Sequence, residues 1–271
     1  MNIVCFPVID WDFLFQRAKH TTIWLARKGH SIIYVNPPSN LPRDVHIHKP
    51  TIQYITDARA IKFVTITPGN GIDLSEFSTE SPENFDYHGV FFARLIPEKG
   101  IFDLIEIWKL VVKKMPNAKL AVCGIAEETE IVKKFLKEVS KYNLSNNIEF
   151  LGQQDKAKLL NIVANSYLTV YPSYVDSFSL VTLESLACGT PVIAYDIPAI
   201  RHNFRKCKSV FRCPVGNKTS MADTILHVLT KMERKTLTIE AKKFATSYDW
   251  DKVVKAEKEA YAQVINLNRQ A

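Results

Sequence analysis

Several features that would signal a secreted or membrane-embedded protein are missing from this sequence. None of its five cysteines forms a Cys-x-x-Cys pair, which fits a reducing compartment better than a disulfide framework. No apolar run approaches the roughly 18 residues that a membrane-spanning helix needs. The N-terminus from Met1 to Ile9 lacks a basic region and is followed at once by Asp10, unlike a secretory signal. We therefore expect a cytoplasmic protein, soluble or peripheral at a membrane.

Internal repeats and low-complexity tracts are also missing, whereas apolar and basic residues are plentiful. An apolar content of 46% is enough for a proper core. The 35 Lys and Arg residues exceed the 28 Asp and Glu residues, for a formal net charge of +7, which favours anionic partners such as nucleoside diphosphates, nucleic acid or a lipid surface. Trp24, Trp108 and Trp250 do not interleave with cations as a single-strand nucleic-acid platform does. We therefore expect no nucleic-acid partner.

Short apolar runs alternate with amphipathic segments along most of the chain. The runs predict strands at 2–8, 31–35, 88–93, 119–123, 148–151, 167–171 and 191–195. The amphipathic segments predict helices at 15–27, 101–114, 127–142 and 155–164, from residue 178, and at 219–232, 234–247 and 251–267. Five βα units in succession indicate a doubly wound parallel sheet.

This alternation divides the chain into four predicted parts. Residues 1–66 form a small N-terminal βαβ lobe and residues 67–85 a hinge that contains proline. Residues 86–247 form a Rossmann-like lobe, and residues 248–271 a C-terminal helix, expected to pack back on the first lobe.

The most informative segment places Asp176 and Glu184 on either side of a predicted helix start near 178–180. The free N–H groups of the first helical turn and the helix dipole form an anion site that suits a phosphate. Glu184 lies about a turn and a half further on, so the two carboxylates can contact groups on both sides of that phosphate. A phosphate flanked by hydroxyl-binding carboxylates describes a nucleotide sugar.

The second informative segment is a basic, proline-containing turn that follows the predicted strand at 88–93, with the sequence Ala93-Arg-Leu-Ile-Pro-Glu-Lys-Gly100. Arg94 and Lys99 can aim two cations at one phosphate group, and the next helix adds its N-terminal dipole. A solvated surface turn is the alternative interpretation. The position at a strand end, facing a second phosphate-suited helix start, favours the binding role.

These motifs together resemble a known family from about Val64 to Ala262. The motifs Asn70-Gly-Ile-Asp73, Ala93 to Gly100, Cys123-Gly124, Leu151-Gly152, Asp176-x7-Glu184 and Cys188-Gly-Thr-Pro-Val192 are similar to those in the nucleotide-binding lobe of retaining, two-lobed (GT-B) glycosyltransferases of family 4. The resemblance implies an α/β, GT-B-like fold with a doubly wound C-terminal lobe and a reduced N-terminal βαβ lobe.

The resemblance also implies roles for individual residues. Arg94 and Lys99 would hold the donor diphosphate, Asp176 would contact the donor sugar, and Glu184 the ribose. Backbone amides of Phe178, Ser179 and Leu180 would complete the phosphate cradle, and Gly124 and Gly152 would lie near the base. The nucleoside-diphosphate sugar is a co-substrate, and we expect no cofactor and no metal ion, because cations and a helix dipole can stabilise the leaving diphosphate. The acceptor, whether glycan, lipid or protein, is left open.

The sequence departs from the family pattern in two places. The usual Glu-Gly-Phe-Gly is Asp176-Ser-Phe-Ser179 here, so the first acid is one methylene shorter, while the serines can cap the helix. The N-terminal lobe is also much smaller than the usual acceptor lobe. A partner protein that completes this lobe, or a non-catalytic nucleotide-sugar-binding subunit, is therefore the alternative to an autonomous transferase.

Several other residues are weaker candidates for functional roles. Gln16 and Arg17 could contact the diphosphate from the first lobe, although Asp12 capping a helix with Arg17 on its surface explains the segment equally well. His46 and His48 are interpreted as surface or structural histidines, and Cys207 with Cys213 lacks the further ligands that zinc requires. The lysines at 133, 134, 137 and 141 lie either on a solvated helix face or against anionic lipid headgroups.

Overall fold

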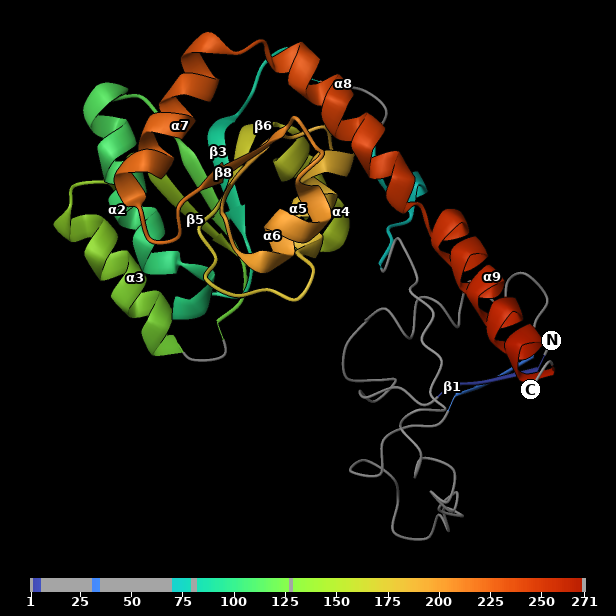
Figure 1. Cartoon of the computed structure of the whole chain (residues 1–271). Coiled ribbons are helices and arrows are strands. Elements are labelled where there is room, and N and C mark those ends of the chain that lie inside the picture. Colours follow the sequence, from blue (N-terminus) through green and yellow to red (C-terminus); the bar gives the residue numbers. More distant parts are fainter. Residues whose placement is uncertain (1, 6–30, 35–69, 79–81, 127–128, 270–271) are drawn as a thin grey trace, which may run out of the picture. The chain divides into compact units, whose positions relative to one another are not determined.

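The computed structural model of the chain describes residues 2–5, 31–34, 70–78, 82–126 and 129–269. Two compact units can be distinguished, one made of Met1–Ile72 together with Tyr248–Ala271 and one made of Asp73–Ser247 (Figure 1). The second unit contains the large sheet and most of the residues that the sequence singles out.

The first unit contains a parallel strand pair and a long helix. Strand β1 (Asn2–Cys5) pairs with β2 (Ser31–Tyr34), which confirms the predicted parallel pairing. Helix α9 (Trp250–Arg269) closes the chain, and an isolated parallel bridge joins Ile72 to Asp249. The helix predicted at 15–27 lies outside the described residues, as do His46 and His48.

The second unit is built on a six-stranded parallel sheet with the order β5-β4-β3-β6-β7-β8. Its strands are β3 (Tyr87–Phe92), β4 (Leu120–Cys123), β5 (Ile148–Gly152), β6 (Ser166–Tyr171), β7 (Val192–Tyr195) and β8 (Val210–Cys213). The order runs outward in both directions from the neighbours β3 and β6. Loops diverge at such a switch point, and open α/β sheets bind ligands there, beyond the carboxyl ends of the strands.

Helices cover both faces of this sheet (Figure 1). Helices α2 and α3 pack together on one face, where α2 also contacts α7, whereas α5 packs against both α4 and α8. The bounds are α2 Ile101–Lys114, α3 Thr129–Lys141, α4 Lys156–Ala164, α5 Leu180–Ala187, α6 Pro198–Phe204, α7 Lys218–Lys231 and α8 Arg234–Ala245. The α/β class with a doubly wound parallel sheet, predicted from the sequence, is confirmed for this unit.

The centre of the sheet is fully buried, as expected for parallel strands with helices on both faces. All four residues of β4 are buried, and so are Val90 to Phe92 in β3. Trp108 of α2 is completely buried, and a Cβ atom on Gly89 would lie 2.9 Å from its ring. The strand that leads to Lys99 therefore has a rigid support.

The structure corrects the sequence-based description in two respects. Strand β8 and helix α6 were not predicted. Strand β8 lies at the sheet edge, and its exposed Arg212 interrupts the apolar run that marks the central strands. Helix α5 begins at Leu180 and not at Phe178, because Ser179 is its N-cap.

Candidate functional site

Two loops from the neighbouring strands β3 and β6 lie against each other at the switch point. The backbone N–H of Tyr174 donates to the carbonyl oxygen of Glu98 at 2.9 Å. Gly100 has a left-handed backbone with φ 74°, and a Cβ atom there would lie 1.9 Å from the carbonyl oxygen of Pro172. Only glycine fits this contact without displacing the backbone, so the sequence at position 100 determines how closely the loops approach.

This approach brings Lys99 and Asp176 together. The Nζ of Lys99 lies 3.0 Å from Oδ2 of Asp176, and their side chains are 14% and 16% exposed. Lys99 also donates to the carbonyl oxygen of Val175 at 3.0 Å and to the hydroxyl of Tyr171 at 3.2 Å. The lysine is therefore fixed by three contacts and is not a flexible surface cation.

Tyr171 is the third member of this cluster. Its hydroxyl donates a hydrogen bond to Oδ2 of Asp176, and its side chain is buried at the end of β6. Burial alone would raise the pKa of Asp176, but the hydrogen bond from Tyr171 and the ammonium of Lys99 outweigh it, so that pKa is lowered. Burial and the charge of Asp176 raise the pKa of Tyr171. At neutral pH the cluster is therefore an ionised carboxylate between a cation and a neutral phenol.

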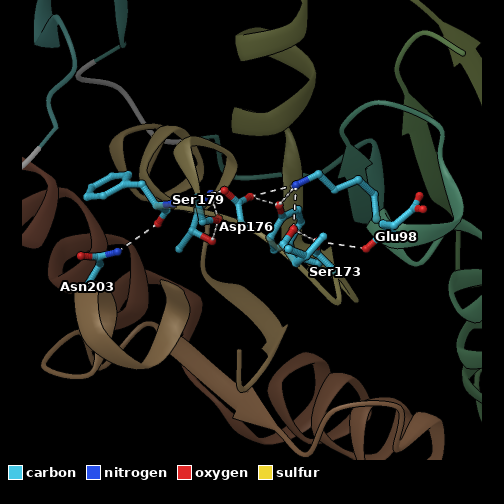
Figure 2. Close-up of polar contacts among 10 residues, drawn as sticks. Glu98, Ser173, Asp176, Ser179 and Asn203 are labelled. Atoms are coloured by element: carbon cyan, nitrogen blue, oxygen red, sulfur yellow. Dashed lines mark hydrogen bonds and ion pairs between the residues drawn. The ribbon is translucent and has the colours of Figure 1, made fainter. Parts of the chain in front are cut away.

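The other oxygen of Asp176 contacts the segment that enters α5. Oδ1 accepts hydrogen bonds from the backbone N–H groups of Phe178 at 3.3 Å and Ser179 at 3.0 Å. Figure 2 shows Asp176 between Ser179 on one side and the contact of Ser173 with Glu98 on the other. Two of the three amides expected to cradle a phosphate therefore bind a side chain of the protein itself.

Ser179 has two structural roles at the start of α5. Its backbone is left-handed, with φ 76°, where the family pattern has glycine, and its Oγ accepts a hydrogen bond from the N–H of Thr182 at 3.3 Å. The hydroxyl satisfies one of the free donors of the first turn. Asn203 of α6 supports the same turn, because its Nδ2 donates to the carbonyl oxygen of Phe178 at 3.3 Å (Figure 2).

Glu184 lies in the second turn of α5 and is partly buried. Burial raises the pKa of its carboxyl group to about 7, with Lys156 lowering it and Glu76 raising it further. Lys156 and Glu76 form an ion pair with each other. A carboxyl group with such a pKa can accept or donate a hydrogen bond at neutral pH, which suits recognition of a hydroxyl pair.

Three of the remaining predicted residues lie at or just beyond the ends of β3, β4 and β5. Arg94 is exposed and follows β3 directly. The N–H of Gly124 donates to the carbonyl oxygen of Gly152 at 2.9 Å, after β4 and at the end of β5. A Cβ atom at Gly152 would meet nothing within 4 Å, so this strand end is open to an approaching group. Arg17 lies outside the described residues.

A second polar network supports the loop that carries Asp176. Oδ2 of Asp103, in the first turn of α2, accepts hydrogen bonds from the hydroxyls of Tyr174 at 2.5 Å and Tyr195 at 2.8 Å. The Nζ of Lys218 lies 3.4 Å from Oδ1 of the same carboxylate. Sequence reasoning missed this network and Asn203 because their contacts join elements that are distant in the chain. It missed Tyr171 because nothing in a buried strand marks one hydroxyl as a partner for the nearby Asp176.

The described residues contain neither a metal-binding cluster nor a membrane-spanning helix. No group of three or more His, Cys, Asp or Glu side chains that could hold a metal ion occurs among these residues. Cys123, Cys188, Cys207 and Cys213 are buried free thiols. None of the helices described is long and apolar enough to cross a membrane.

Comparison with known proteins relates this chain to one family. The family model described as glycosyl transferases group 1 matches residues 77–244, well over half of the chain. An uncharacterized glycosyltransferase of Methanocaldococcus jannaschii is 28% identical over 196 residues, which cover 72% of this chain and 52% of the relative. The chain thus spans about half the length of that relative.

Solved structures show the same fold. Sucrose-phosphate synthase from Thermosynechococcus elongatus matches with a TM-score of 0.63 and 18% identity, covering 98% of this chain and 59% of that one. HepE of Anabaena, solved in complex with UDP, matches with a TM-score of 0.63 and 19% identity, covering 92% and 62%. At these identities the likeness establishes the fold alone.

Proposed function

Because the chain belongs to the group 1 glycosyltransferases, we propose that it transfers a sugar from a nucleoside-diphosphate donor to an acceptor hydroxyl. We further propose that the reaction is of the family 4 type, retains the anomeric configuration and uses no metal ion. The observation that carries this proposal is the fixed ammonium of Lys99 beside the start of α5 at the switch point of the sheet.

The diphosphate of the donor would bind between the loops that follow β3 and β6. Lys99 and Arg94 supply positive charge, and the N-terminal end of α5 adds backbone N–H groups and the helix dipole. These groups stabilise negative charge as it develops on the leaving diphosphate, the part that a divalent ion plays in other transferases. In a retaining transfer the acceptor hydroxyl approaches from the face that the diphosphate leaves, and a phosphate oxygen takes its proton.

The nucleoside would extend from this point along the strand ends. Glu184 suits the ribose hydroxyls, because its carboxyl group, with a pKa of about 7, is placed inside α5 beyond the phosphate-binding turn. The open position beside Gly152 leaves room for a base. The complex of HepE with UDP supports a nucleoside diphosphate as the ligand class.

A double substitution tests this assignment. We expect Arg94→Ala with Lys99→Ala to lower the rate of sugar transfer, or of donor hydrolysis measured as nucleoside-diphosphate release, by about 100-fold or more, the effect of removing charge stabilisation from a leaving group. The matched control removes the exposed Lys114 and Arg205, which have the same charges and lie outside the site. Activity within a few-fold of the parent would show that the diphosphate assignment is wrong.

The same assay separates an autonomous enzyme from a partner-dependent subunit. An autonomous transferase turns over donor and acceptor as a purified single chain. Binding of the donor without turnover, with turnover restored by a co-purified protein, would instead favour the alternative in which a partner completes the acceptor side.

A further inference from the structure

The carboxylate of Asp176 contacts the groups that are suited to a diphosphate. Lys99 donates to its Oδ2 at 3.0 Å, and the N–H groups of Phe178 and Ser179 donate to its Oδ1 at 3.3 and 3.0 Å. A lysine ammonium and successive backbone N–H groups at the start of a helix are typical donors to phosphate oxygens. The aspartate carboxylate therefore contacts donors of the kind that bind a phosphate group.

The buried side chain of Tyr171 holds the carboxylate of Asp176 in this position. The hydroxyl of Tyr171 donates to Oδ2, the oxygen that also contacts Lys99. Tyr171 is buried, so its ring cannot leave without disrupting the core. The bonds to the amides two and three residues ahead are the local turn that an aspartate makes readily, and a glutamate at this position would place its carboxylate further out.

We infer that Asp176 is an internal anion that competes with the donor diphosphate for Lys99 and the amides at the start of α5, and that Tyr171 is the positioning residue that holds it there. This inference rests on the proposed function. Binding of the donor then requires the carboxylate to move away from these donors, and the aspartate does not serve as a contact to the donor sugar while it remains between them.

A competing anion and a sugar contact have opposite effects on ligand affinity when the side chain is removed. Removing a sugar contact weakens binding of the nucleotide sugar and leaves binding of the sugar-free nucleoside diphosphate unchanged. Removing a competing anion tightens binding of the nucleoside diphosphate itself. It also lowers the stability of the unliganded protein, because the carboxylate satisfies buried and partly buried donors. Higher affinity with lower stability is a combination that a purely structural role does not produce.

The test is calorimetric titration of the full chain with UDP, GDP, ADP and TDP. We expect Asp176→Asn to bind the preferred nucleoside diphosphate roughly tenfold or more tightly than the wild type, because one negative charge near the ligand is removed. Tyr171→Phe, which keeps the carboxylate but loses its anchor, should bind about threefold more tightly, since a weakly held anion is displaced more easily. Asp196→Asn is the control, because Asp196 also follows a strand and pairs with Arg201 and Arg212 away from Lys99.

The outcomes separate the two levels of the account. Unchanged or weaker binding by Asp176→Asn, with a wild type that binds, overturns the inference and leaves the proposed function standing. Equal tightening by Asp196→Asn also overturns it, because the effect would then be one of net charge. If neither the wild type nor Asp176→Asn binds any of the four nucleotides, the proposed function falls, and the inference falls with it.

Discussion

The close approach of the loops that follow β3 and β6 makes Gly100→Ala an informative stability test. An alanine in the left-handed region costs about 1 to 2 kcal/mol. Its Cβ atom would also lie 1.9 Å from the carbonyl oxygen of Pro172, so the two loops have to separate, and overpacking of this kind costs about 1 to 3 kcal/mol more. We therefore expect Gly100→Ala to lower the free energy of unfolding by about 2 to 5 kcal/mol.

Gly152→Ala is the matched control for this change. Gly152 has a similar left-handed backbone, with φ 67°, but nothing lies within 4 Å of its added Cβ atom. It should cost only the backbone share, about 1 to 2 kcal/mol. Urea denaturation of both variants gives the comparison, and nucleoside-diphosphate titration shows whether Gly100→Ala also weakens binding by moving Lys99. Equal destabilisation by the two substitutions would refute the claim that the contact between the loops is tight.

Three further changes test other parts of the site. The carboxyl group of Glu184 has a pKa raised from 4.5 to about 7 in the folded protein, so its ionisation opposes folding as the pH rises through that window. At pH 8 we therefore expect the free energy of unfolding of Glu184→Gln to exceed that of the wild type by about 1 to 2 kcal/mol, with little difference at pH 4. Urea denaturation at both pH values checks this, and a pH-independent difference contradicts it. Both Ser179→Ala and Ser179→Gly lose the N-cap hydroxyl, but only glycine relieves the strain of the left-handed backbone. Thermal unfolding should therefore find Ser179→Gly more stable than Ser179→Ala by about 1 kcal/mol. Asn203→Ala removes the side-chain bond to the carbonyl oxygen of Phe178 and should cost about 1 kcal/mol in denaturant unfolding, whereas the exposed His202→Ala should cost nothing measurable.

Most of the fold could be predicted from the sequence because the central strands are buried on both faces. Their continuous apolar runs, such as Leu120–Cys123, distinguish them from the helices that alternate with them. Strand β8 escaped notice because an edge strand exposes Arg212. The predicted start of α5 is two residues early because Ser179, whose backbone is left-handed, is the N-cap of the helix.

Only the part of the site that follows from the sheet topology could be predicted from the sequence. Parallel strands end at one edge, so the loops bearing Lys99 and Asp176 could be expected to meet. That these two residues bind each other depends on Gly100 and Tyr171. In the sequence, Tyr171 resembles the other residues of a buried strand. No local pattern indicates that its hydroxyl bonds to the carboxylate of Asp176, five residues later.

The most direct test of the proposed donor site is a thermal-shift series with UDP, GDP, ADP and TDP and their common sugar conjugates, using Glu184→Ala as the site-specific control. The account predicts that nucleotides of one base raise the melting temperature of the wild type and that the rise is lost in the variant. No stabilisation by any of them, or an equal rise in Glu184→Ala, would contradict it.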